Sequence, residues 1–226
     1  MHVELLEFLR CVRPHEPSWL VASVDCIEER DILTGRLGCP ACGTEYEIRD
    51  GVADLSLNAA SGPPARTPTS PRGSAHAVPA SSHLALRAAA LLDLTTPGGF
   101  VLLAGSWSEA AFELVTLLDS VHILVLNPAT QVASGYGVSI VLCPTDVPIR
   151  PGSTRGAALD ASHSTPEWIA ATTTSVRDRG RIVAHADAPV PGGVTILARD
   201  AHDWVAETNQ TTASIVQIAR SRPAPN

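Results

Sequence analysis

The stretch 100-FVLLAGSWSEAAFELVTLLDSVHILVLN-127 decides the fold of this chain. It begins and ends in apolar runs, 100–105 and 121–127, that have the length of buried strands. Ser106 and Glu109 stand as a capping box before a helix over 108–120. The apolar residues of this helix recur at helical spacing, at 111, 114, 115, 117 and 118. Two apolar strands joined by a helix predict a parallel βαβ unit.

The alternation of strand and helix continues on both sides of this stretch, across residues 83–208. Helical spacing predicts further helices, and apolar runs bounded by turn residues predict further strands. The helices are expected at 83–94 and 166–178, and the strands at 138–143, 156–161, 180–187 and 193–200. Because the strands are apolar throughout, we expect a doubly wound, Rossmann-like α/β domain with a mostly parallel sheet.

Residues 1–57 predict a different unit, a small α+β domain. A short helix is expected over 3–11, two strands around a polar turn within 19–39, and a third strand at 44–50. Asp50-Gly51 is a turn signal. The pattern favours a small antiparallel sheet.

The two units are separated by a segment of different composition. Residues 58–82 are dominated by Ala, Ser, Pro and Gly, which predicts a disordered linker. Residues 209–226 form a polar tail. The expected organisation is therefore a domain at 1–57, a linker at 58–82, a second domain at 83–208 and a tail.

Charge and composition exclude several functions. The net charge is −7, with 5 Arg against 11 acidic residues in 1–57 and 7 Arg against 12 in 83–208. Neither unit offers the basic surface that neutralises phosphates, so no direct nucleic-acid binding is expected. All 16 basic residues are Arg, which rules out chemistry that needs a lysine, such as a Schiff base or a P-loop.

The cysteines and the apolar runs indicate the compartment. No apolar run reaches the roughly 18 residues that span a bilayer, and the first residues lack the basic start of a secretory signal. Five cysteines are an odd number, which disfavours a disulfide framework. We expect a cytoplasmic protein with no membrane partner, in which Cys-x-x-Cys indicates metal or redox chemistry.

Cys39-Pro-Ala-Cys42 has the spacing of half a zinc site, and Gly38 and Gly43 permit the tight turn that it needs. Four ligands are required, and the other two must come from upstream. Cys11 and His15 lie four apart around Pro14, whereas Cys26 lies in the middle of a predicted strand. We therefore favour His15 over Cys26 as the fourth ligand. The predicted structural zinc ligands are Cys11, His15, Cys39 and Cys42.

Two alternatives to zinc compete for the cysteines. A redox Cys-x-x-Cys opens a helix after a strand, whereas Cys39-x-x-Cys42 precedes a strand, which disfavours redox chemistry. The other alternative is a pair of buried cysteines without a metal.

Residues 5–57 resemble a known family. The segments 5-LLEFLRC-11, 39-CPAC-42 and 46-YEIRDGVADL-55 resemble the zinc-ribbon activator subunit of tRNA, rRNA and release-factor methyltransferases and its short bacterial relatives. That family has a helix ending in Leu-x-Cys-Pro, a second Cys-x-x-Cys, and then Tyr-Pro-Ile-x-Asp-Gly-Ile-Pro. The positions that match the second half are Cys39, Cys42, Tyr46, Ile48, Asp50 and Gly51. Glu47 replaces a family proline, and His15 would replace the second cysteine of the first knuckle.

The resemblance implies a zinc ribbon that binds a protein partner, such as a methyltransferase, through strand pairing and an apolar docking face. The candidates for that face are Leu5, Leu6, Phe8, Leu9, Val52 and Leu55. The alternative, which we favour for most of them, is that these side chains pack the core of the ribbon itself.

Residues 83–127 resemble the opening of class I S-adenosylmethionine-dependent methyltransferases. In that family the first strand ends in Asp/Glu-x-Gly-x-Gly-x-Gly, where the backbone approaches the cofactor, and the second ends in an acid that holds the ribose. Here Gly105 keeps one motif position and Asn127 stands at the end of the second strand. Other residues occupy the remaining motif positions: Leu103, Trp107 and Glu109. Asp160 and His163 lie where the family's fourth strand delivers catalytic groups.

These patterns predict a zinc-binding scaffold or partner-stabilising protein whose methyltransferase-like domain is inactive. The alternative is an active S-adenosylmethionine-dependent methyltransferase with its activator in the same chain, in which Gly105, Asn127 and Asp160 would face the cofactor. A third hypothesis is an acidic zinc-ribbon adaptor in a larger complex. An open cleft at the ends of strands 100–105 and 121–127 would favour the enzyme, whereas a cleft filled by Trp107 would favour the binding protein.

Overall fold

The structure is a computed structural model that describes residues 1–56, 82–144 and 146–209. The predictions of a linker at 58–82 and a tail at 209–226 lie almost entirely outside these residues. None of the helices in the described part is both long and apolar enough to cross a membrane.

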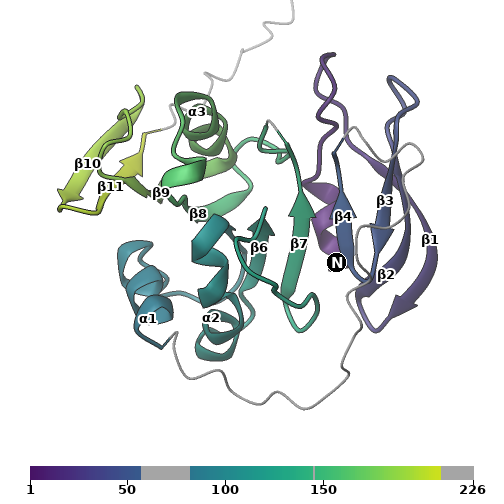
Figure 1. Cartoon of the computed structure of the whole chain (residues 1–226), viewed down its shortest axis with the longest axis horizontal. Coiled ribbons are helices and arrows are strands. Elements are labelled where there is room, and N and C mark those ends of the chain that lie inside the picture. The colour runs from purple at the N-terminus through teal and green to yellow at the C-terminus, as the bar shows by residue number, and fades with distance from the viewer. Residues whose placement is uncertain (57–81, 145, 210–226) are drawn as a thin grey trace, which may run out of the picture.

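The strands of the described residues form one continuous sheet (Figure 1). Their bounds are β1 (Val21–Glu28), β2 (Asp31–Gly38), β3 (Glu45–Arg49), β4 (Val52–Asp54), β5 (Phe100–Ala104), β6 (His122–Leu126), β7 (Val138–Leu142), β8 (Thr154–Ala158), β9 (Val176–His185), β10 (Val194–Arg199) and β11 (Asp203–Thr208). The order across the sheet is β1-β2-β3-β4-β7-β6-β5-β8-β9-β11-β10.

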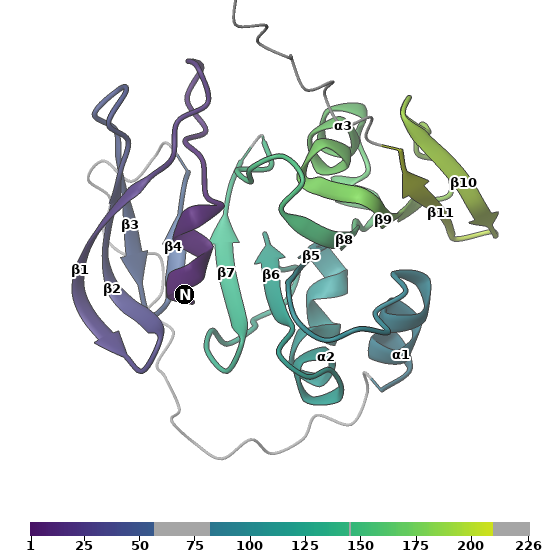
Figure 2. The same cartoon turned by 180° about the vertical axis from the view of Figure 1, so that it is seen from behind.

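Helices cover both faces of this sheet (Figure 2). Their bounds are α1 (Ser82–Leu91), α2 (Ala111–Leu117) and α3 (Pro166–Ser175), with three 3₁₀-helices, η1 (Val3–Glu7), η2 (Gly105–Ala110) and η3 (Ala161–His163). Strand β5 shows the two faces, because Phe100 and Leu102 enter the core under η1 and α3, whereas Val101 and Leu103 enter the core under α1 and α2. Burial on both faces explains why β5 and β6 are apolar throughout.

The second half of the chain has the predicted Rossmann-like fold. Strands β7, β6, β5, β8 and β9 are neighbours in that order, and every neighbouring pair is parallel. Numbered along the chain from β5, this is the order 3-2-1-4-5 of a doubly wound sheet. The switch point, where the strand order reverses, lies between β5 and β8. Strand β11 then pairs antiparallel with β9, and β10 pairs antiparallel with β11.

The first half is an antiparallel sheet of four strands, β1 to β4. Strand β3 alternates along its length, and its buried positions are Tyr46 and Ile48. Asp50 and Gly51 both have positive φ and form the predicted turn into β4.

The two halves share one sheet because β4 pairs in parallel with β7. Val52, Ala53 and Asp54 lie opposite Ile140, Val141 and Leu142. One residue further on, the Leu55 amide donates to the carbonyl of Leu142 at 2.7 Å. The last strand of the first half therefore extends the sheet of the second half.

The first half also covers one face of the second half. The connection from β7 to β8 contains no helix in its described residues, and η1 packs against this face instead. Leu9 is 0% exposed and forms an isolated bridge with Ile149. The rings of Phe8 and Phe100 lie 4.9 Å apart, and the Arg150 amide donates to the carbonyl of Phe8 at 2.8 Å.

The candidate docking face is therefore covered by the same chain. Leu5, Leu9 and Leu55 are fully buried in a core shared with β5 and β6, and Leu6 and Phe8 pack against that core. Val52 packs against the core on the other face of the sheet. These side chains are therefore not an exposed face, and they do not form a core of the first half alone. They belong to cores that both halves share.

Several predicted elements differ from those observed. The helix expected over 3–11 is only the 3₁₀-helix η1, because Leu9 and Arg10 leave it to form backbone bridges with Ile149 and Trp19. The capping box was wrong, since α2 begins at Ala111 without a side-chain cap and the Ser106 amide donates to Asp160 instead. The sequence patterns did not predict β4 and β11.

Candidate metal centre and switch-point site

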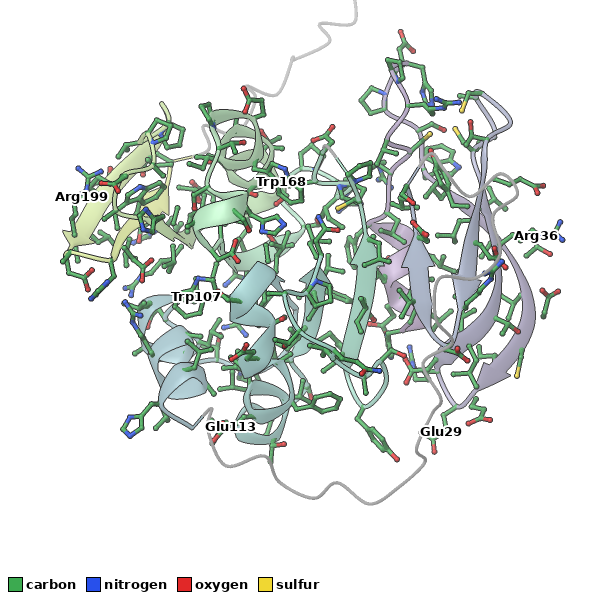
Figure 3. All side chains as sticks on the ribbon, in the orientation of Figure 1. Glu29, Arg36, Trp107, Glu113, Trp168 and Arg199 are labelled. Carbon is green, nitrogen blue, oxygen red and sulfur yellow. The ribbon has the colours of Figure 1, made fainter. Side chains whose placement is uncertain are left out.

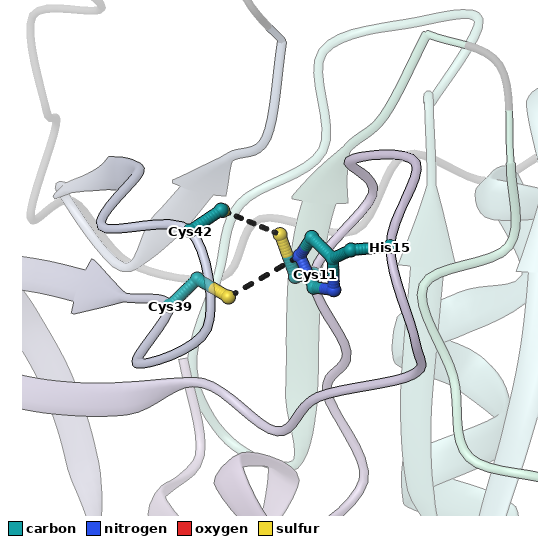
Figure 4. A group of neighbouring side chains, drawn as sticks. All are labelled: Cys11, His15, Cys39 and Cys42. Carbon is teal, nitrogen blue, oxygen red and sulfur yellow. Dashed lines mark hydrogen bonds between the residues drawn. The ribbon is translucent and has the colours of Figure 1, made fainter.

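Two loops bring the four predicted zinc ligands together at one end of the first half (Figure 4). Cys11 and His15 lie in the loop between η1 and β1, and Cys39 and Cys42 lie in the turn after β2. This turn is closed by the Gly43 amide, which donates to the carbonyl of Cys39 at 2.8 Å, and Gly43 has a φ of +70°. One ligand atom from each of the four residues lies within 4.8 Å of the others.

The spacing of these atoms suits a tetrahedral ion. Cys11 Sγ and Cys42 Sγ are 3.8 Å apart, and Cys39 Sγ lies 3.4 Å from His15 Nε2. Zinc–sulfur bonds of about 2.3 Å in a tetrahedron place their sulfur atoms about 3.8 Å apart. Cys26 is not part of this group and is exposed on β1. The four residues fit a structural zinc ion with no open coordination position.

Hydrogen bonds prepare several of these side chains to bind a metal. The carbonyl of Glu16 accepts from His15 Nδ1 at 2.6 Å, which leaves Nε2 of the neutral ring free as a ligand. Hydrogen bonding with Thr44 lowers the pKa of the Cys42 thiol to about 6. Burial alone raises the pKa of Cys39, but the amides of Cys42 and Ala41 offset this, and its pKa is lowered.

Tyr46 lies beneath the cluster and connects it to the core. Its hydroxyl is 3.1 Å from Cys11 Sγ, and its ring is buried. Burial, followed by the contact with Cys11, raises the pKa of Tyr46 well above its ordinary value. The hydroxyl therefore stays protonated and can donate to the Cys11 sulfur. The alternation of residues 44–50 was the signal that Tyr46 points inward.

The second candidate site lies at the switch point, where Gly105 and Asp160 meet. Gly105 follows β5 with a φ of +61°, and a Cβ atom placed there would lie 1.9 Å from Asp160 Oδ2. The same oxygen accepts from the Ser106 amide at 2.8 Å. The space above Gly105 is therefore filled by a carboxylate of the chain itself.

Asp160 is held by a small hydrogen-bond network. His163 Nδ1 lies 2.7 Å from Asp160 Oδ1, and the Ser162 hydroxyl donates to the same oxygen at 2.7 Å. Burial alone raises the pKa of Asp160, but hydrogen bonds from His163, Ser106 and Ser162 lower it well below its ordinary value. Asp160 is therefore ionised at neutral pH and orients the ring of His163.

Asn127 also lies at this edge, but its amide is used between strands. Its Nδ2 donates to the carbonyl of Cys143 at 2.7 Å, and its Oδ1 accepts from the Cys143 amide at 2.8 Å. Asn127 Nδ2 also lies 3.4 Å from His163 Nε2. The structure thus brings Gly105, Asn127 and Asp160 to one edge of the sheet, where they bind residues of the chain.

Trp107 does not fill a cleft between β5 and β6. It is 5% exposed and belongs to the core under α1 and α2, with the Arg87 guanidinium 5.5 Å from its ring centroid (Figure 3). Trp107 instead forms one wall of a cavity of about 310 Å³ beside the switch point. The other lining residues are Leu84, Arg87, Ser106, Asp160, Ala161, His185, His202 and Asp203. No sequence pattern indicated that Arg87 lines this cavity or that the Ser106 amide binds Asp160.

Comparison with known proteins identifies no family for the chain. No protein-family model matches it, and neither does any curated protein. One similar solved structure is a complex between the Haloferax volcanii Trm112 methyltransferase activator and a methyltransferase. It is 15% identical over 45% of this chain and 50% of that chain, with a TM-score of 0.37.

Two further solved structures are similar at the same level. The antibiotic-resistance methyltransferase Kmr is 12% identical over 55% of this chain and 92% of that chain, with a TM-score of 0.38. The [4+2]-cyclase SpnF is 10% identical over 51% and 57% of the two chains, with a TM-score of 0.40. The chain thus spans about half the length of the first of these structures. These TM-scores are too low to support an argument. The assignment of a Rossmann-like fold therefore rests on the strand order of the chain itself.

Proposed function

We propose that this chain is a zinc-stabilised binding protein, in which the first half is a built-in structural partner of a methyltransferase-like second half. The observation that carries the proposal is the junction between the halves. The first half supplies strand β4 to the sheet edge and η1 to a face on which the described residues of the β7–β8 connection form no helix. A separate activator subunit would have to supply such contacts from another chain.

Zinc supports this role because a ribbon of this size has little core of its own. Cys11, His15, Cys39 and Cys42 would hold the ion, with no position left for a reacting water. The ion would fix the two ligand-bearing loops, at 11–15 and 39–42, relative to each other. The strands that adjoin these loops would then be fixed against the second half.

We further propose that the second half does not transfer methyl groups. In the family that it resembles, the backbone at the end of the first strand approaches the cofactor. Here the Asp160 carboxylate lies over Gly105, and the Asn127 amide bonds to the backbone of Cys143. Both groups that could receive S-adenosylmethionine are therefore engaged within the chain.

A separate protein partner remains part of this proposal, with a methyltransferase as one such partner. The apolar face that the resemblance assigns to such a partner is covered within the chain. The partner would therefore bind a different surface.

The test is calorimetric titration of the full, zinc-loaded chain with S-adenosylmethionine and S-adenosylhomocysteine. The proposal expects no saturable binding to protein that circular dichroism shows to be folded. Asp160→Ala removes the carboxylate above Gly105 and is expected to admit the ligand if that carboxylate alone closes the site. Asp178→Ala, at an exposed carboxylate of β9, is the matched control. Micromolar binding by the unmodified chain would overturn the proposal.

The second candidate function is an active S-adenosylmethionine-dependent methyltransferase. It is favoured by the positive φ of Gly105 at the end of β5 and by the adjacent cavity of about 310 Å³. Ligands of doubly wound folds bind at this switch point. Gly105, Asn127 and Asp160 would then face the cofactor, and His163 would be the candidate base. The same titration decides between the two functions.

A further inference from the structure

Two histidines and a glutamate meet where the first half contacts β6. His2 is the N-cap residue of η1, Glu4 lies in its first turn, and His122 is the first residue of β6. One ligand atom from each lies within 4.8 Å of the others. The ring centroids of His2 and His122 are 4.2 Å apart. These residues belong to neither of the sites described above.

The cluster is shielded from water on one side and reaches the surface on the other. His2 is 6% exposed, whereas Glu4 lies on the surface. Glu4 also forms an ion pair with Arg30.

Two buried polar atoms nearby have no hydrogen-bond partner among the described residues. They are His122 Nδ1 and Asp31 Oδ1. An unsatisfied buried polar group is destabilising, so such atoms indicate a missing partner. Asp31 is held close to the cluster, because it forms a backbone bridge with His2. A bound cation would supply a partner for the imidazole nitrogen, whereas the Asp31 carboxylate already interacts with the Met1 ammonium.

The backbone around the cluster is fixed from both halves. The His2 amide donates to the Ser139 hydroxyl of β7 at 2.9 Å, and the Val3 amide donates to the carbonyl of Arg30 at 2.8 Å. His122 is fixed in turn by its place in β6, which pairs with β5. Ligands on fixed elements lose little freedom when a metal binds.

We propose that His2, Glu4 and His122 form a second metal site, for a divalent ion of the zinc class, that clips the start of the first half to β6. Two imidazoles and one carboxylate are a donor set that zinc uses in proteins. Because Glu4 is exposed, a water molecule can take the fourth position. The site differs from the cysteine cluster in having no sulfur ligand.

The experiment is titration of the metal-free full chain with Co²⁺ and with Zn²⁺, followed by calorimetry and absorption. The unmodified protein is expected to bind two equivalents. The cysteine site gives a thiolate-to-cobalt charge-transfer band, and the second equivalent adds d–d absorption without that band. His122→Asn and Glu4→Gln are each expected to weaken the second equivalent by at least about tenfold and to leave the charge-transfer band unchanged.

His83→Asn, at an exposed histidine of α1, is the matched control and is expected to retain both equivalents. Glu4→Gln keeps the test decisive if His122→Asn fails to fold, because Glu4 lies on the surface. Binding of only one equivalent, with the thiolate-to-cobalt charge-transfer band, would overturn the proposal. A second equivalent that Glu4→Gln binds with unchanged affinity would overturn it as well.

Discussion

Leu9→Ala is the substitution that best tests whether the two halves fold as one unit. Leu9 is 0% exposed and packs in the core that joins η1 to β5 and β6. Truncation of a fully buried leucine to alanine costs about 3 kcal/mol, within a range of about 2–5 kcal/mol. Because the whole stability of a domain is about 5–15 kcal/mol, this loss is easily measured.

The assay is urea unfolding of the zinc-loaded protein, followed by far-ultraviolet circular dichroism and by tryptophan fluorescence. With a urea m-value of about 1–3 kcal/mol/M, the midpoint is expected to fall by about 1–3 M. Three of the four tryptophans, Trp107, Trp168 and Trp204, are buried in the second half, whereas Trp19 in the first half is 63% exposed. The change in fluorescence on unfolding therefore reports mainly on the second half, even though the substitution is in the first. Both probes are therefore expected to shift together.

Leu86→Ala is the control, because Leu86 is 56% exposed on α1 and its truncation is expected to cost no more than about 0.5 kcal/mol. The reasoning would be refuted if the protein unfolded in two separate transitions and Leu9→Ala shifted only the transition that tryptophan fluorescence does not follow. That outcome would mean that the halves fold independently.

Three further predictions concern the two sites. Asp160→Asn is expected to destabilise the protein by about 1.5–3 kcal/mol at neutral pH, through weaker charge-assisted hydrogen bonds, as measured by urea unfolding. Because the pKa of Asp160 is lowered in the folded state, its contribution is present above the ordinary carboxyl pKa of about 3.9. The cost of Asp160→Asn should therefore shrink as the pH falls below that value, and a constant cost would contradict the network. Zinc affinity measured by competition with a chelator is expected to fall at least about tenfold from about pH 7 to about pH 5, as protons compete for the Cys42 thiolate. Cys26→Ser is expected to leave zinc stoichiometry unchanged, whereas Cys39→Ser should abolish binding at the cysteine cluster; a loss of zinc from Cys26→Ser would exclude His15 as the fourth ligand.

The sequence predicted those parts of the molecule that follow from local pattern. Strands β5 and β6 are apolar throughout because both of their faces are buried, and this pattern can be read without any knowledge of neighbours. The grouping of His15 with Cys39 and Cys42 followed from the spacing of knuckle residues and from the place of Cys26 within a strand.

The junction between the halves could not be predicted in this way. Strand β4 has three residues, too few for any periodicity, and its partner β7 lies more than eighty residues further along the chain. The contact of Asp160 with Gly105 also depends on how β5 and β8 are placed side by side. Such contacts come from tertiary structure, on which a window of sequence carries no information. The apolar residues near the start of the chain were candidates for a docking face or for the core of the ribbon, but the surface that they contact belongs to the second half of the same chain.

The most direct test of the built-in partner is hydrogen exchange measured by mass spectrometry, with and without a zinc chelator. If the first half stabilises the second, removal of zinc should speed exchange not only in residues 1–56 but also in β7 and the connection at 146–150. Strands β8 and β9, which are further along the sheet, should change less. Exchange that rises only in residues 1–56, with β7 unchanged, would contradict the account.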